Sequence, residues 1–193
     1  MLSACSGVSV KDTGRPNQQA YQQRADIINA WPQWGLAGRI SLDDGDEGGS
    51  GKLKWSVQPG NSELDFYAAL GRGAWHLQIS PDRAVLTEAN GTRQSAGSVN
   101  DLIRERMGWP LPVEALQWWV RGLAAPGPID DREMDSSGLL VSLQQFGWRV
   151  EYSRYDDGGL VSMPKRLNAT MKDYRVKLAI SQWRLSGNHV IQD

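Results

Sequence analysis

Short segments in which apolar and polar residues alternate fill most of the chain after residue 33. The clearest of them span 34–41, 52–57, 64–68, 75–80, 148–153 and 174–181. A period of two gives a β-strand one apolar face. The turns between the early segments are too short for crossover helices, so these strands are expected to pair antiparallel.

Weaker alternation raises the number of expected strands to about ten. The additional segments span 84–86, 92–94, 139–143 and 167–171. The Asn90-Gly91 pair is a strong hairpin signal. In 139–143 we assign the apolar face to Leu139, Val141 and Leu143. A sheet this long should curl on itself, which predicts a mainly β fold that approaches a barrel and can hold a ligand.

Helical patterns precede and interrupt the strands. Residues 18–30 carry apolar side chains near helical spacing, which predicts an amphipathic helix. Ser98, with an acidic residue three positions later, is expected to cap a second helix. Pro112 occupies a plausible first position of a third helix, which should end at Gly122. A Pro- and Gly-rich loop is expected over 124–131.

The single cysteine, Cys5, ends the sequence Leu2-Ser3-Ala4-Cys5. An apolar residue, two small residues and a cysteine form a bacterial lipobox, in which the thiol takes a diacylglycerol. Four residues precede Cys5, so the signal segment that such a site needs is expected to be truncated. Ser6, where Asp would favour inner-membrane retention, fits an outer-membrane lipoprotein. The alternative is an unmodified thiol in a polar tail.

This interpretation divides the chain into three parts. Residues 1–17 are expected to form the lipobox and a flexible tether, 18–185 a single barrel domain, and 186–193 a loose tail. The composition of 9 Trp and 2 Phe suggests an apolar interior with polar edges, or a wide pocket. A tryptophan-rich packed core is the other explanation.

Residues that would carry catalysis or bind a cofactor are scarce. The two histidines, His76 and His189, are far apart in sequence and are expected to be surface residues. The segment 48–52 resembles a phosphate loop but lacks its first Gly and its Ser or Thr, and it leads into a strand. The acidic run 43–47 lacks EF-hand spacing. A net charge of −1 gives no basic footprint for nucleic acid. We therefore expect no enzyme, cofactor, metal site or nucleic-acid partner.

Several short motifs follow one another in a specific order. They are Trp34-Gly35-Leu36-Ala37-Gly38-Arg39-Ile40, Leu70-Gly71, Asn90-Gly91, Leu111-Pro112-Val113, Gln145-Phe146-Gly147-Trp148 and Lys177-Leu178. Together with the lipobox, they resemble the LolB family over about 34–183. The resemblance implies an unclosed antiparallel β-barrel of about ten to eleven strands, in which helices form a lid over an apolar cavity.

The resemblance also implies a function. Such a protein is anchored to the outer membrane, facing the periplasm, and accepts passenger lipoproteins from the periplasmic carrier LolA. It then inserts them into the inner leaflet of the outer membrane, without nucleotide hydrolysis, and we expect it to act as a monomer. A protruding loop with an exposed apolar residue delivers the lipid, and the matching position is Leu70. The family often has Pro before this residue, whereas this chain has Ala69.

The cavity residues implied by this resemblance are the inward-facing ones, although alternation alone does not separate a cavity wall from a packed core. They are Trp55, Phe66, Leu77, Ile79, Trp119, Trp148, Val150, Tyr152, Leu178 and Ile180. Two other functions compete with lipoprotein reception. One is an envelope protein that binds a small amphiphile without contacting LolA. The other is an envelope hydrolase, which would need a nucleophile and a base that the sequence does not supply.

Overall fold

The fold is an eleven-stranded antiparallel sheet with three helices, seen in a computed structural model that describes residues 15–69, 73–156 and 159–185. Cys5 and Leu70 lie outside the described residues. The helices are α1 (Arg15–Asn29), α2 (Val99–Met107) and α3 (Val113–Trp119). The strands are β1 (Trp34–Asp43), β2 (Gly48–Gln58), β3 (Asn61–Ala68), β4 (Ala74–Ser80), β5 (Arg83–Glu88), β6 (Arg93–Ala96), β7 (Asp131–Met134), β8 (Leu140–Gln145), β9 (Trp148–Tyr155), β10 (Pro164–Met171) and β11 (Tyr174–Leu185).

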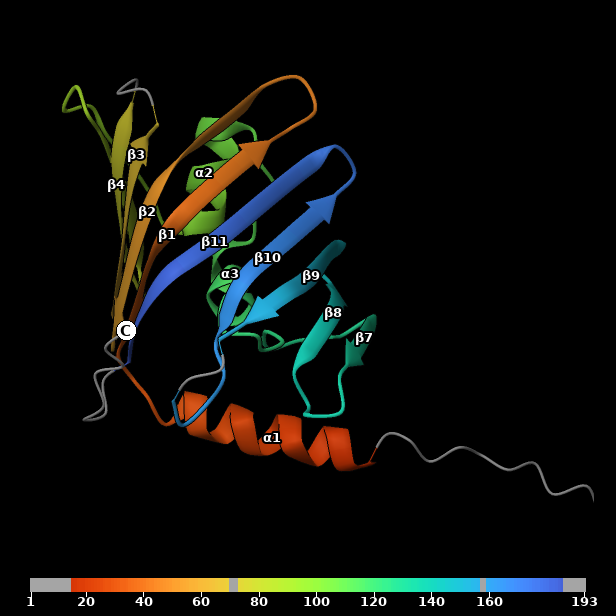
Figure 1. Cartoon of the computed structure of the whole chain (residues 1–193). Helices are drawn as coiled ribbons and strands as arrows, with labels where there is room; N and C mark the ends of the chain where they lie inside the picture. The colour runs from red at the N-terminus through yellow and green to blue at the C-terminus, as the bar shows by residue number, and fades with distance from the viewer. Residues whose placement is uncertain (1–14, 70–72, 157–158, 186–193) are drawn as a thin grey trace, which may run out of the picture.

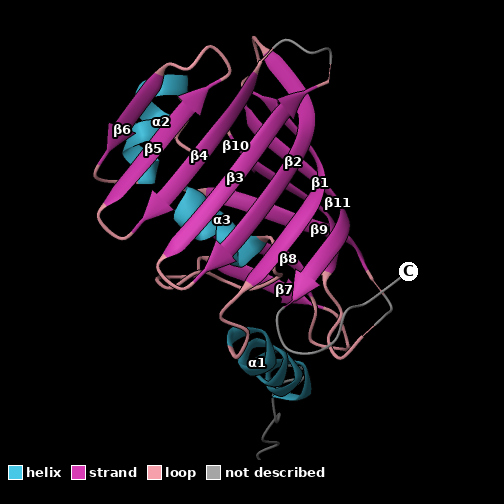
Figure 2. Cartoon of the chain, turned by 90° about the vertical axis from the view of Figure 1, so that its left-hand side faces the viewer, coloured by secondary structure: helices cyan, strands magenta, loops and turns pink. Residues whose placement is uncertain are grey.

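The strands form one continuous sheet in the order β6-β5-β4-β3-β2-β1-β11-β10-β9-β8-β7. Pairing of β1 with β11 joins the two halves of the chain, and β6 and β7 are the two edges. The sheet therefore curls without closing, as the resemblance implied. The strands on either side of the β1–β11 pair, β6 to β2 and β10 to β7, form the two arms of the sheet. Figure 1 shows α2 and α3 between these arms and α1 across one end. Figure 2 shows α2 behind β5 and β6, which it contacts.

The core lies on the concave side of this sheet, where α2 and α3 pack. Alternate residues are buried along the strands, as expected for strands with one apolar face: Leu53 and Trp55 in β2 are 2% exposed, whereas Lys52 and Lys54 are exposed. Ser98 caps α2 as predicted, because its side chain accepts hydrogen bonds from the backbone N–H groups of Asn100 and Asp101. Within the described ranges, no helix is long and apolar enough to cross a membrane.

One edge of the sheet differs from the prediction. Strand β7 was not expected, and it begins where the Pro- and Gly-rich loop was placed. The face assigned in 139–143 is wrong for Val141, which is 40% exposed, while Leu140 is fully buried. Glu133 pairs with Ser142 and Met134 pairs with Leu140, so Val141 is an additional residue in β8. Such a bulge reverses the alternation, and a single-strand pattern does not reveal it.

Two smaller boundaries also differ from the sequence-based expectations. Pro112 is the N-cap of α3 rather than its first helical residue, and regular helix ends at Trp119. The chain turns at Gly122, where φ is +71°. This left-handed conformation favours glycine.

Candidate functional site

The ten predicted cavity residues all lie in one apolar cluster on the concave side of the sheet. They come from β2, β3, β4, β9, β11 and α3, so the curled sheet brings together segments that are distant in sequence. Eight are buried, and Phe66 and Ile79 are partly buried against the same cluster. Trp55, Trp119 and Trp148 are among its largest fully buried side chains. In this conformation most of these positions are therefore packed core.

Helix α3 fills the space between the arms of the sheet, and buried polar contacts hold it there. Trp119 donates a hydrogen bond of 3.0 Å from Nε1 to Gln145 Oε1. Gln145 also accepts from the backbone N–H of Ala125 at 3.0 Å and donates to the Ala125 carbonyl at 2.8 Å. The Tyr152 hydroxyl donates to the Trp119 carbonyl at 2.9 Å. These contacts fix both ends of the segment from 119 to 125 against β8 and β9.

A pocket of about 750 Å³ opens beside α3, at the end of the sheet that carries the β2–β3 turn. Its apolar lining includes Val57, Ile79, Pro112, Trp118, Pro126 and Phe146. Ile79 is the one predicted cavity residue that lines it. A volume of this size lies within the range of small-molecule sites, so the pocket offers apolar space next to the packed core.

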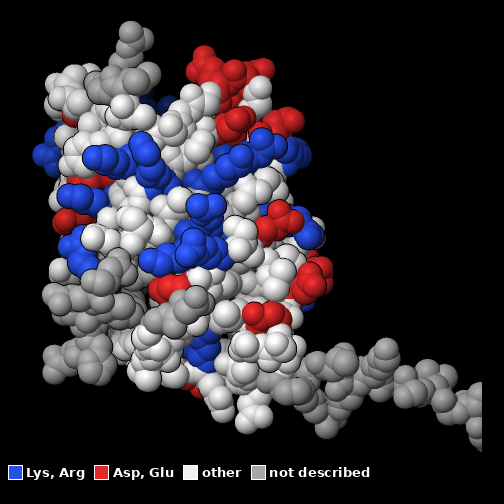
Figure 3. All heavy atoms as spheres, in the orientation of Figure 1, with Lys and Arg blue, Asp and Glu red and all other residues white. Residues whose placement is uncertain are grey.

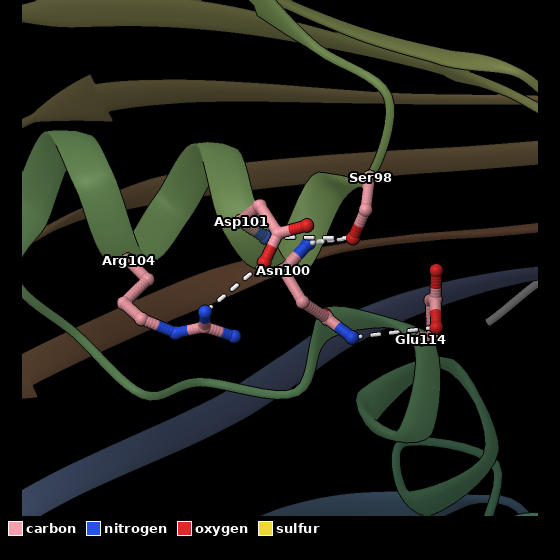
Figure 4. Close-up of polar contacts among 5 residues, drawn as sticks. All are labelled: Ser98, Asn100, Asp101, Arg104 and Glu114. Carbon is pink, nitrogen blue, oxygen red and sulfur yellow. Dashed lines mark hydrogen bonds and ion pairs between the residues drawn. The ribbon is translucent and has the colours of Figure 1, made fainter.

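The two helices over the concave face touch at the rim of this pocket. Asn100 at the start of α2 donates from Nδ2 to Glu114 Oε2 of α3 at 3.3 Å, as Figure 4 shows. Asp101 and Arg104 form an ion pair of 3.0 Å within α2. A second ion pair, between Arg106 of α2 and Glu88 of β5, ties this helix to the sheet. Helix α2 is thus held by its apolar face and by polar contacts at both of its ends.

Two buried arginines lie where α1 meets the C-terminal end of α3. Arg24 donates to the carbonyl oxygens of Arg121 at 2.7 Å, Gly122 at 2.9 Å and Ser162 at 3.0 Å. Burial lowers the pKa of Arg24 from its ordinary value. A cation beside the carbonyls that follow a helix is placed favourably with respect to the helix dipole. Arg24 therefore fastens α1 to the base of the site.

Arg121 lies between two tryptophan rings. Its guanidinium carbon is 4.7 Å from the ring centre of Trp118 and 5.4 Å from that of Trp34. Burial, and then the neighbouring charge of Arg24, lower the pKa of Arg121 to about 10. It stays positive at neutral pH, and the two aromatic faces stabilise this buried charge.

The polar residues that hold the site together were not predicted. Gln145 begins the motif 145–148, but no function was predicted for its side chain, although it follows Leu143 on the inward face of β8. Arg24 shares the buried face of α1 with Tyr21, Ala25 and Ile28 at helical spacing. A charged or amide side chain at a position that the periodicity assigns to the apolar face is the signal that could have identified both residues.

The structure positions the segments that flank Leu70, which lies outside the described part of the chain. Ala68 N–H donates to the Gly73 carbonyl at 3.0 Å, and Ala69 N–H donates to the Ser50 carbonyl at 3.0 Å. The connection between β3 and β4 is therefore anchored on both sides. Among the described residues, no group of three His, Cys, Asp or Glu side chains could hold a metal ion.

Comparison with known proteins identifies the family. The profile described as "Outer membrane lipoprotein LolB" matches residues 32–183. An outer-membrane lipoprotein LolB of Pseudomonas fluorescens is 33% identical over 185 residues, covering 95% of this chain and 90% of the relative. That of Pseudomonas aeruginosa PAO1 is 32% identical over 186 residues, covering 95% and 91%.

A solved structure shares the fold. A putative outer-membrane lipoprotein-sorting protein domain from Vibrio parahaemolyticus superimposes with a TM-score of 0.57 over 90% of this chain and 93% of its own, at 10% identity. This likeness concerns the fold alone, and it agrees with the unclosed sheet described above. On the strength of the profile match and the relatives, the chain belongs to the LolB family of outer-membrane lipoproteins.

Proposed function

We propose that this chain receives lipoproteins from the soluble periplasmic carrier LolA and passes them to the inner leaflet of the outer membrane, acting as a monomer. The observation that carries this proposal is the family membership of a fold whose apolar concave face is covered by two short helices. Acyl chains bind such a face because it removes them from water. Transfer runs downhill if each successive site binds the chains more favourably.

Helix α2 is the part of the cover that is best suited to move. It contacts β5, β6 and α3, and β6 is an edge of the sheet. Among the α2 side chains that the structure describes, only Val99, Leu102 and Ile103 are buried. Helix α3, in contrast, is fixed by the buried hydrogen bonds of Trp119. Elements with fewer buried contacts open at lower free energy, so an entering acyl chain would displace α2 first and extend the pocket along the concave face.

Cys5 and Leu70 complete the proposal at the membrane. Acylation of Cys5 would anchor the protein, because about 0.8 kcal/mol is gained for each buried CH₂ group. Leu70 would enter the bilayer from the connection between β3 and β4, where the sequence 68–71 carries no charge. A hairpin tip usually carries polar residues, so an uncharged apolar tip supports a role in contact with lipid.

A transfer assay tests this function. Purified carrier loaded with a lipoprotein is mixed with the protein and then with liposomes, and the passenger is followed to each. We expect the wild type to accept and insert the passenger, and Leu70→Glu to accept it without inserting it. The matched control is Leu160→Glu, because Leu160 is a leucine that is 72% exposed in another loop. This variant should transfer like the wild type.

The same assay separates the competing function. An envelope protein that binds an amphiphile without the carrier would take nothing from the loaded carrier, yet it would still bind a fluorescent fatty acid. That pair of results would overturn the receptor function. Loss of transfer in both leucine variants would overturn the specific role of Leu70.

A further inference from the structure

The outer face of the sheet, opposite to α2 and α3, concentrates positive charge on its central strands. Strands β2, β10 and β11 contain two, two and three lysines or arginines, and none of the three contains an aspartate or glutamate. Strand β1, between β2 and β11, contains Arg39 and one carboxylate, Asp43, at its end. Because the whole chain has a formal charge of −1, this concentration reflects placement and not composition.

Six exposed cations form a basic band across five neighbouring strands. They are Lys52 and Lys54 of β2, Arg39 of β1, Lys177 of β11, Arg166 of β10 and Arg154 of β9. The register aligns four of them: Lys52 pairs with Arg39, Arg166 pairs with Arg154, and Ala179 of β11 lies between Arg39 and Arg166. This row spans about 19 Å, because neighbouring strands are about 4.8 Å apart. Figure 3 shows the band crossing this face, with acidic side chains gathered beyond it.

The described part of the fold forms no ion pair with these charges, although Lys54 lies opposite Asp65 of β3, whose carboxylate contacts His76. In the part of the chain that the structure describes, none of the six takes part in an ion pair or a side-chain hydrogen bond; the ion pairs formed there by lysine or arginine involve Arg104, Arg106 and Arg149. Like charges directly opposite each other on adjacent strands are unfavourable. A row that contains two such pairs therefore gives the folded chain no internal benefit, which points to a partner outside it.

We propose that the basic band binds anionic phospholipid headgroups at the surface of the membrane. Charge complementarity favours this partner, and the family places the chain at the outer membrane. Protein interfaces are enriched in aromatic residues and arginine and depleted in lysine. The outward residues beside the band are mostly small or polar, such as Ala37, Ser41 and Ala179, and one exposed aromatic residue, Tyr67, lies opposite Lys52. Long cationic side chains whose neighbours are mostly small or polar suit a layer of phosphate groups, where each cation adds about fivefold to binding.

Vesicle cosedimentation tests the proposal with the whole chain, produced without acyl groups and without any passenger lipoprotein. Vesicles of phosphatidylcholine alone are compared with vesicles that contain about one third phosphatidylglycerol. We expect binding to the anionic vesicles to be stronger by about tenfold or more, and to fall when ionic strength rises from about 0.1 M to about 1 M. The triple variant Arg39→Gln, Lys52→Gln, Arg166→Gln should lose this preference.

The control removes the same charge elsewhere. Arg83→Gln, Arg93→Gln and Arg104→Gln neutralise three exposed arginines of β5, β6 and α2, and this variant should keep the preference for anionic vesicles. Equal binding to both kinds of vesicle, or an equal loss in both variants, would overturn the proposal. It does not depend on lipoprotein transfer, since the triple variant should still deliver a passenger to vesicles of phosphatidylcholine alone. Failure of that transfer in the wild type would count against the proposed function only.

Discussion

Gln145 and Trp119 are joined by a hydrogen bond of 3.0 Å between two wholly buried side chains. Gln145 uses its remaining capacity on the backbone N–H and carbonyl of Ala125. One amide therefore satisfies three polar groups that have no access to water. This arrangement makes α3 a fixed wall of the site, against which the other helix can move.

Replacing this amide should cost considerable stability. Gln145→Leu leaves the indole N–H of Trp119 and both main-chain groups of Ala125 buried without partners, and the free energy of unfolding should fall by about 2–4 kcal/mol. Urea denaturation followed by tryptophan fluorescence measures the change. Gln144→Leu, at the exposed neighbouring position, should change stability by less than about 0.5 kcal/mol. Similar losses in the two variants would show that the buried contacts do not matter.

Arg24 should be equally important for the attachment of α1. Arg24→Met keeps much of the apolar stem but leaves the carbonyls of Arg121, Gly122 and Ser162 without their donor. We expect a loss of about 2–4 kcal/mol and faster proteolysis within α1. Arg24→Lys should recover only part of the loss, because an ammonium group does not reproduce the planar fork of donors. Gln23→Met, on the exposed face of α1, is the control and should leave proteolysis unchanged.

Alkaline pH should destabilise the protein through two tyrosines. Burial raises the pKa of Tyr152 well above its ordinary value of 10, and burial also raises the pKa of Tyr155. Above pH 10 the unfolded chain loses these protons while the folded protein retains them, so stability is full below that pH and falls above it. Each tyrosine contributes a slope of about 1.4 kcal/mol per pH unit.

The tyrosine variants separate this effect from other alkaline titrations. Tyr152→Phe and Tyr155→Phe should each lower stability at neutral pH, because each loses a hydrogen bond. Between pH 10 and 11, however, the free energy of unfolding measured in urea should fall less steeply in each variant, the slope being smaller by about 1.4 kcal/mol per pH unit. Tyr67→Phe, at a position that is 49% exposed, should keep the slope of the wild type. A wild-type slope in the two buried variants would contradict this explanation.

Local pattern predicted the parts of the fold that local physics determines. Alternation in β2 and β4 identified their inward residues, since one face of each strand must leave water. The serine at position 98 identified the start of α2, because its side chain caps a helix end without any tertiary contact. The cysteine motif and the order of short motifs identified the family, which the profile and the relatives confirm.

Features that depend on a partner strand or helix could not be predicted in the same way. The reversed face at Val141 follows from a bulge that is defined only when β8 is paired with β7. Trp119 was placed on the apolar face of its helix, but only the fold shows that α3 packs between the arms and leaves this indole without exposure. Alternation gives the direction of a side chain and not the distance to what lies above it, so the packed core and the pocket beside it remained indistinguishable.

The ion pair between Arg106 and Glu88 offers a test of which helix moves. Both side chains are partly exposed, at 42% and 27%, so Arg106→Gln should lower global stability by less than about 1 kcal/mol. Because this pair connects α2 to β5, its loss should nevertheless favour local opening of α2 and speed amide hydrogen exchange in 99–107 severalfold. Arg104→Gln removes an ion pair that lies wholly within α2, and it should leave exchange at the β5 contact unchanged. Faster exchange in α3 than in α2 in the wild type would contradict this prediction. It would mean that α3 opens first, because the hydrogen bonds of Trp119 hold it less firmly than the contacts of α2.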